Sequence, residues 1–278
     1  MRKTAIALSA FALAVTMGAC GDNGGSNDDA GGNGGGNGGG TVAAASLADL
    51  AKSIGDKTAE TNTAHVKISA DAAGQKIEGD GDVKFAAQDV QMSMDMTTPE
   101  GTMSMVFLDN VFYIKLPQEL EPGKSWVKID TNDDNPIAKA LGGMTEQMSK
   151  NADPRAALEE FEKSGEITSS KEEDLEGQKT MHYTITVDVE KLAANQTDPT
   201  MKSALEQSIQ AGMKDFPVDL WINEDDLPVR FKMDMPTPDP TGSGTNTTVK
   251  MQMDYSKWGE PVEITAPDAA EIAEFPGA

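Results

Sequence analysis

The residues best able to do chemistry are few and scattered along this chain. His65 and His182 are the only histidines, and Cys20 is the only cysteine. HExxH and Gly-x-Ser-x-Gly motifs are absent, and no cysteine–histidine pairing is apparent. Residues 125–128 match Ser-x-x-Lys, but they lie in an alternating stretch and not at a helix start. The acidic residues at 172–174 and 224–226 fit solvated turns. The sequence therefore predicts no enzyme and no catalytic residue.

Two groups of residues suggest metal sites, and both have simpler readings. Residues 130–134 look faintly like a calcium loop, but Asn135 and Leu141 stand where the loop needs Gly and Glu. Their acids fit better as caps of a helix that starts at Pro136. Met-x-Met pairs offer soft thioether ligands for Cu(I). However, His182 points to the opposite strand face from Met181, so we predict no metal and no cofactor.

Cys20 closes a segment with the marks of an export signal. Arg2 and Lys3 precede an apolar run over 5–16, which is too short to span a bilayer. Gly18 and Ala19 then lead into Cys20 in a pattern that resembles a bacterial lipobox, with Met17 where that pattern prefers Leu. The resemblance implies cleavage, acylation of Cys20 and a lipid-anchored extracytoplasmic protein. The alternative is a plain secretory signal that leaves an incidental thiol.

The composition after Cys20 indicates a tether and then one domain. Apart from Ala30 and Thr41, residues 21–41 are Gly, Asn, Asp and Ser. Such a segment cannot bury much apolar surface, and its reach is roughly 25 Å. We therefore assign 1–19 to a signal peptide, 20–41 to the anchor cysteine and tether, and 42–278 to a single domain. The net charge of −23 argues against binding to nucleic acid and against electrostatic binding to anionic lipid. Attachment to a membrane would rest on acylated Cys20.

Alternation of apolar and polar residues dominates the domain. Such a period of two predicts strands with one buried and one wet face, as in antiparallel sheets. Short turns at 99–101, 109–110 and 224–226 separate some of these runs, and about ten or eleven strands are expected. The clearest alternating stretches are 90–96, 181–189, 216–222, 229–235 and 249–255.

Helical spacing appears in four segments. Ser46 begins a capping-box-like sequence, and prolines at 136, 154 and 199 follow capping side chains. We expect helices from Ser46, at about 136–150 and 154–164, and at 199–214. The predicted fold is α+β: a large curved antiparallel sheet, or half-barrel, with several amphipathic helices over its concave face.

Methionine is abundant on the apolar strand faces. The chain has 16 Met residues, and methionine is an adaptable side chain that suits deformable apolar surfaces. The face is therefore either a Met-rich closed core or a deformable pocket for acyl chains. The candidate ligand-binding residues are Met94, Met96, Met103, Met105, Phe107, Ile185, Val187, Leu220, Phe231, Met233, Met251 and Met253.

The order of lipobox, tether, first helix and strands resembles the LppX/LprG group of actinobacterial lipoproteins, within the LolA-like fold. The resemblance is carried by GQKTMHYTITVD (177–188), PVDLWINEDDLPVR (217–230) and MDYSKWG (253–259). It implies an antiparallel half-barrel enclosing an apolar cavity for the acyl chains of a lipid or glycolipid, and a role in lipid transport in the cell envelope. A partner in such transport is not identified. The alternative function is an envelope protein-interaction or sensor module with a closed core and no ligand.

Overall fold

The structure is a computed structural model of the chain. The structure describes residues 44, 46–72, 74–85, 90–99, 101–116, 119, 121–133, 162–196, 199–237 and 247–273. The elements are α1 (Leu47–Thr61), β1 (Thr63–Ala72), β2 (Gln75–Lys84), β3 (Gln91–Thr98), β4 (Gly101–Leu108), β5 (Val111–Lys115), β6 (Trp126–Asp130), β7 (Gly165–Leu175), β8 (Gln178–Asp188), α4 (Val189–Asn195), α5 (Pro199–Gln210), β9 (Asp215–Asn223), β10 (Pro228–Thr237), β11 (Thr247–Ser256), η1 (Ala269–Glu271) and β12 (Ile272–Ala273).

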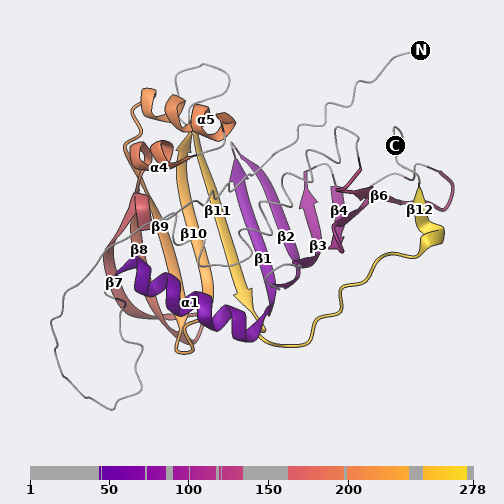
Figure 1. The fold of residues 1–278 in the computed structure, drawn as a ribbon, viewed down its shortest axis with the longest axis horizontal. Coiled ribbons are helices and arrows are strands. Elements are labelled where there is room, and N and C mark those ends of the chain that lie inside the picture. Colours follow the sequence, from indigo (N-terminus) through magenta and orange to yellow (C-terminus); the bar gives the residue numbers. More distant parts are fainter. Residues whose placement is uncertain are drawn as a thin grey trace.

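One open sheet contains all the strands of the described residues (Figure 1). Its order is β12-β6-β5-β4-β3-β2-β1-β11-β10-β9-β8-β7, so two meanders, β1 to β6 and β7 to β11, are joined by pairing of β1 with β11. All neighbours are antiparallel except β12, which runs parallel to β6. The expected α+β class with a large, mainly antiparallel sheet is confirmed. The half-barrel curvature stays a prediction.

The alternating sequence produces these strands because one side chain in two is buried. In β8, Met181, Tyr183, Ile185 and Val187 are buried, whereas His182, Thr184 and Thr186 between them are less so. The predicted turn at Asp109 and Asn110 joins β4 to β5, and both residues have positive φ, of 53° and 62°. Such φ values match the twist of a tight hairpin.

Helix α1 forms at the predicted place. The Ser46 side chain accepts a hydrogen bond from the backbone N–H of Asp49, which caps the first turn, and Asn62 ends the helix with a φ of 52°. The apolar stripe of α1 is buried against residues of β8 and β9. α1 crosses one face of the sheet at its β7–β10 end, whereas α4 and α5 lie at one end of the strands (Figure 1).

Other helix predictions had different outcomes. The expected segment 199–214 corresponds to α5, which ends at Gln210. The segments at 136–150 and 154–161 lie outside the described residues, and residues 162–164 are helical. Helix α4 was not predicted, because Val189 continues the alternation of β8. Asp188 instead ends the strand and accepts a hydrogen bond from the backbone N–H of Lys191. The prediction of several helices over the concave face is therefore not confirmed. Among the described helices, α1 is the one that crosses a face of the sheet.

Candidate functional site: the apolar face of the sheet

The strand register aligns apolar side chains in a continuous row from β8 to β4. Directly paired residues of antiparallel strands point to the same face, so the row lies on one side of the sheet. We call this side, which α1 partly covers, the apolar face, and the other side the polar face. The row consists of Tyr183, Leu220, Phe231, Met253, Ile68, Gly79, Met96 and Met103.

Parallel rows extend the apolar face on both sides. One contains Ile185, Val218, Met233, Met251, Ala70 and Ile77. Another contains Tyr255, Val66, Gly81, Met94, Met105, Ile114 and Val127. Phe107 pairs with Met92, and Val187 pairs with Phe216. The structure therefore brings all the ligand-binding residues proposed within the sheet onto one face. Their role in binding stays a prediction.

The two ends of the apolar face are closed cores. Beneath α1, Ile185 and Val187 are fully buried, and Leu220 is nearly so. At the other end, Phe107 packs with Phe112, Val127 and Ile129. Four of the proposed ligand-binding residues, Ile185, Val187, Leu220 and Phe107, thus belong to packed clusters. In this structure Ile185, Val187 and Leu220 pack against α1, whereas Phe107 packs against residues of β5 and β6.

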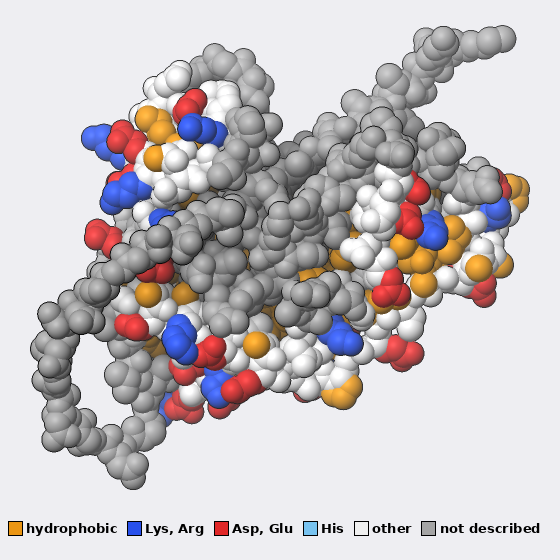
Figure 2. All heavy atoms as spheres, in the orientation of Figure 1, with side chains coloured by type: hydrophobic (Ala, Val, Ile, Leu, Met, Phe, Trp, Pro, Cys, Tyr) orange, Lys and Arg blue, Asp and Glu red, His pale blue; other side chains and the backbone are white. Residues whose placement is uncertain are grey.

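The centre of the apolar face holds a third buried cluster and a set of less tightly covered residues. The cluster is Ala64, Val66, Val83 and Val90, with Tyr255 packed against it. We call the less tightly covered set the methionine stripe: Met94, Met96, Met103, Met105, Phe231, Met233, Met251 and Met253. Within the stripe, Met94 and Met251 are buried and the other residues are half-buried. Apolar side chains are visible on this side of the molecule toward the β3–β6 end (Figure 2). The stripe offers deformable apolar area, which favours apolar occupants by about 25 cal/mol per Å² removed from water.

Two glycines of β2 interrupt the stripe, and neither was among the predicted site residues. Gly79 and Gly81 lie on the apolar face, opposite Met96 and Met94. A Cβ on Gly81 would lie 2.1 Å from the backbone oxygen of Ser93, so no side chain fits there. A Cβ on Gly79 would meet the Met94 sulfur at 3.1 Å. Glycines two residues apart inside an alternating strand are a detectable signal of close approach.

Tyr255 places a hydroxyl group at the border of the stripe. Its ring stacks on Trp258 with centroids 5.7 Å apart, and Trp258 stacks on Phe85 at 5.8 Å. The Trp258 indole N–H donates to the Pro228 carbonyl at 2.7 Å, which fixes the stack. The Tyr255 hydroxyl donates to the Met253 sulfur at 3.8 Å. Burial raises the pKa of Tyr255 to about 12, so this hydroxyl is a neutral donor near neutral pH.

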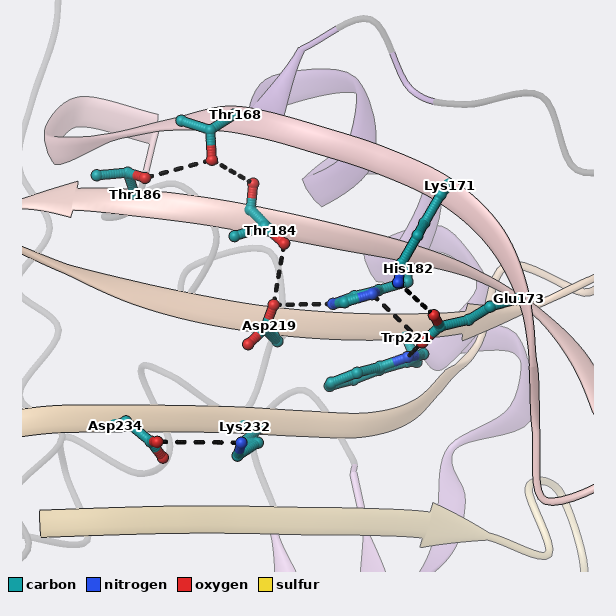
Figure 3. A network of polar contacts seen from close by, with 10 residues as sticks. All are labelled: Thr168, Lys171, Glu173, His182, Thr184, Thr186, Asp219, Trp221, Lys232 and Asp234. Carbon is teal, nitrogen blue, oxygen red and sulfur yellow. Dashed lines mark hydrogen bonds and ion pairs between the residues drawn. The ribbon is translucent and has the colours of Figure 1, made fainter.

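The polar face carries a network around His182 (Figure 3). His182 Nε2 lies 2.8 Å from Asp219 Oδ1, which also accepts from the Thr184 hydroxyl at 3.0 Å. The imidazole stacks on Trp221 with centroids 4.1 Å apart. Glu173 accepts from the Trp221 indole N–H and lies 3.3 Å from His182 Nδ1. His182 lies on the predicted face, but the Trp221 stack leaves its side chain only 11% exposed.

This network joins three strands. Glu173 belongs to β7, His182 to β8 and Trp221 to β9. A hydrogen bond from Lys171, and then that from Trp221, lowers the pKa of Glu173. His65 is held in a similar way, with Asp82 at 2.8 Å and Asp80 at 3.4 Å. These contacts account for both histidines as tethers between strands on the polar face.

The described residues give no sign of a metal centre. They contain no group of three or more His, Cys, Asp or Glu side chains that could hold an ion. Both histidines lie on the polar face, whereas the Met-x-Met pairs of the stripe lie on the apolar face. Thioether and imidazole groups are therefore not brought together for copper.

A pocket of about 400 Å³ lies where β7, β8 and β9 meet α4. Its lining is polar and charged: Ser164, Gly165, Glu166, Thr186, Asp188, Glu190, Lys191, Lys214 and Asp215. It is therefore unlike an acyl-chain cavity. Among the described residues, no helix is both long enough and apolar enough to cross a bilayer.

No family model matches the chain. Over 184 residues it is 24% identical to a Streptomyces griseus protein described as "Uncharacterized 31.2 kDa protein in rplA-rplJ intergenic region". That alignment covers 63% of this chain and 57% of the relative's length.

Three solved structures have a similar arrangement of elements over about four fifths of this chain. LprF from Mycobacterium bovis is 15% identical, with a TM-score of 0.48, over 80% of this chain and 96% of that one. An uncharacterized conserved protein from Thermus thermophilus is 8% identical, with a TM-score of 0.40, over 82% and 98%. MucB, solved in complex with MucA, is 8% identical, with a TM-score of 0.38, over 81% and 59%.

Proposed function

We propose that this protein is a lipid-anchored extracytoplasmic lipoprotein that binds and carries the acyl chains of a lipid or glycolipid on the methionine stripe. The observation that carries the proposal is the contrast along one apolar face. Its ends are closed cores, with Ile185 and Phe112 fully buried, while Met96, Met103, Met253 and Phe231 between them are half-buried. A continuous, flexible apolar surface of this kind suits a chain-like apolar ligand.

The proposed anchor is the acylated Cys20, with 21–41 as tether. Both lie outside the described residues, so this part rests on the sequence: the basic start, the short apolar run and the lipobox-like ending at Cys20. Insertion of a covalently attached acyl chain into a bilayer is favourable by about 0.8 kcal/mol of free energy per buried CH₂. An acidic domain needs such an anchor, because anionic lipid headgroups repel it.

We further propose that the protein binds its ligand without catalysing a reaction. The histidines and the carboxylates that hold them lie on the polar face, on the other side of the sheet from the stripe. In the described residues, the side chains of the stripe are thioethers and one phenyl ring, which are not acid–base groups.

A closed-core interaction module is the second candidate. The tightly buried clusters at the two ends of the apolar face favour it, and so does the polar lining of the pocket beside α4. This candidate requires no ligand on the stripe, so a search for bound lipid separates the two.

The test compares lipid carried by matched charged variants. The chain is expressed in an actinobacterial host and purified, and its organic extract is analysed by tandem mass spectrometry. Met96→Asp and Met103→Asp would place a carboxylate on the stripe, whereas Thr97→Asp and Thr102→Asp place it one residue away, at exposed positions of the polar face.

Acylated lipid in the wild type and in the threonine variants, lost from both methionine variants, is the expected result. Circular dichroism melts of all four variants establish that they are folded. Equal lipid in all folded variants would exclude the stripe as the binding surface. Absence of extractable lipid from the wild type would favour the interaction module.

A further inference from the structure

Tyr255 is the polar group of the described structure best placed to meet a ligand on the methionine stripe. Its side chain is on the apolar face, where it pairs with Val66, and Val66 pairs with Gly81. The stack with Trp258 and Phe85 holds the ring on one side. The hydroxyl lies near the Met253 sulfur, and Met253 belongs to the central row of the stripe. A fixed ring thus presents a hydrogen-bond donor at the border of the apolar surface.

The present partner of that hydroxyl is a poor acceptor. A thioether sulfur accepts hydrogen bonds only weakly, and the oxygen–sulfur distance is 3.8 Å. A buried hydroxyl normally has a good acceptor, because its loss of hydration is otherwise uncompensated. A carbonyl oxygen near Met253 would satisfy the donor better than sulfur does. The flexible Met253 side chain can move aside to admit it.

The surroundings select for a neutral acceptor. Lys67 of β1, Lys232 of β10 and Lys250 of β11 stand on the polar face of the sheet. A carboxylate or phosphate beside Tyr255 would therefore be buried without a cation from these strands, which is strongly unfavourable. An ester carbonyl carries no charge. It also lies directly next to an acyl chain.

We propose that the Tyr255 hydroxyl donates a hydrogen bond to the ester carbonyl of an acyl lipid whose chain lies along the methionine stripe. This inference rests on the proposed function and specifies its ligand as an acyl ester. From β11 the chain would run over β1, β2 and β3 toward β4, a distance of about 19 Å at roughly 4.8 Å per strand. Gly79 lies along this path, and the flexible Met94 side chain that fills the space above it would move aside for the chain.

The experiment is a competition between two lipids that differ at the carbonyl. The delipidated full chain is incubated with equimolar 1-palmitoylglycerol, an ester, and 1-O-hexadecylglycerol, the ether of the same chain length. Native mass spectrometry then gives the ratio of the two bound masses. A hydrogen bond of ordinary net strength corresponds to about fivefold preference for the ester in the wild type. In Tyr255→Phe, which keeps the ring and its stack, the ratio is expected to fall to about one.

A control variant and a second readout separate a ligand contact from a structural role. Tyr113→Phe removes a hydroxyl from the polar face, where Tyr113 pairs with Val106, and is expected to keep the wild-type ratio. The total amount of bound lipid is recorded beside the ratio. If the Tyr255 hydroxyl serves the ligand, Tyr255→Phe loses mainly the bound ester. If the hydroxyl merely holds the fold, Tyr255→Phe loses ester and ether alike with the ratio unchanged, and the proposal is wrong.

The remaining outcomes are distinct. Equal binding of ester and ether by the wild type, or an unchanged ratio in Tyr255→Phe, overturns the role of Tyr255 while leaving lipid carriage intact. Failure of the wild type to bind either lipid overturns the proposed function and this inference together.

Discussion

The Met94 sulfur fills the space above Gly79: a Cβ on that glycine would lie only 3.1 Å from it. The contact joins β2 to β3 at the centre of the apolar face. Because the Met94 side chain is flexible, the space above Gly79 can be emptied without moving the backbone. At Gly81, two residues later, the neighbouring atom is the backbone oxygen of Ser93, which cannot move aside in this way.

Gly79 and Gly81 should therefore differ in their tolerance of alanine. Gly81→Ala forces a Cβ to within 2.1 Å of the Ser93 carbonyl oxygen, so the two strands must separate. We expect a loss of about 1–3 kcal/mol in the free energy of unfolding. Gly79→Ala displaces only the Met94 side chain, and a loss below about 1 kcal/mol is expected. Urea denaturation of both variants is the measurement; equal losses would contradict this account of β2.

The contribution of α1 to the core can be measured at Leu50. Its side chain is almost fully buried in the cluster of β8 and β9 residues. Leu50→Ala should lower the free energy of unfolding by about 2–5 kcal/mol. Lys52→Ala, on the exposed side of the same helix, removes only a surface ion pair with Asp56 and should change it by less than about 0.5 kcal/mol. Similar small effects for both would show that α1 is not docked as described.

Glu173 predicts a component of the pH dependence of stability. Its pKa is lowered in the fold by the hydrogen bonds from Lys171 and Trp221. A lowered folded pKa means that the carboxylate stabilises the fold above its ordinary pKa of about 4.3. That stabilisation is lost as the pH falls through the lower, folded value. As the pH is lowered from about 6 to about 3, the melting temperature should therefore fall less steeply for Glu173→Gln than for the wild type.

A second variant tests whether the hydrogen bond from Lys171 is responsible for the lowered pKa of Glu173. Lys171→Met removes the largest contribution to the lowered pKa but keeps the Trp221 bond. Its pH profile should lie between those of the wild type and Glu173→Gln. If the Glu173→Gln and wild-type profiles superimpose after normalisation, the Lys171–Glu173–Trp221 contacts do not stabilise the fold.

The strands were predictable because the alternation is local. Each of the five clearest alternating stretches lies mostly in a strand, although 90–96 begins one residue before β3 and 181–189 ends one residue after β8. The Asp109–Asn110 and 224–226 turns are where expected. The boundary at Val189 was missed because a valine at an apolar position continues the pattern, while the cap at Asp188 acts through a single hydrogen bond. Whether the segment begins a helix at a capping aspartate or continues as a strand depends on tertiary packing, which the identity of one residue does not reveal.

The site was less predictable because it depends on register between distant segments. The alternation places Met253 and Met96 on an apolar face, but not in one row through Ile68 and Gly79. It also does not reveal that Trp221 covers His182 on the polar face. Nor does it separate packed residues such as Ile185 from half-buried ones such as Met103, since both occupy apolar positions of strands.

The most direct test of acyl-chain binding on the methionine stripe is photo-crosslinking with a palmitate ester that carries a diazirine on its chain. Irradiation of the loaded full chain, followed by peptide mass spectrometry, identifies the residues in contact. We predict adducts on β10, β11 and β1–β4 at apolar-face positions such as Met253, Met96 and Met103, reduced by excess unlabelled ester. Adducts confined to the polar face, or no adducts that unlabelled ester removes, would contradict the account.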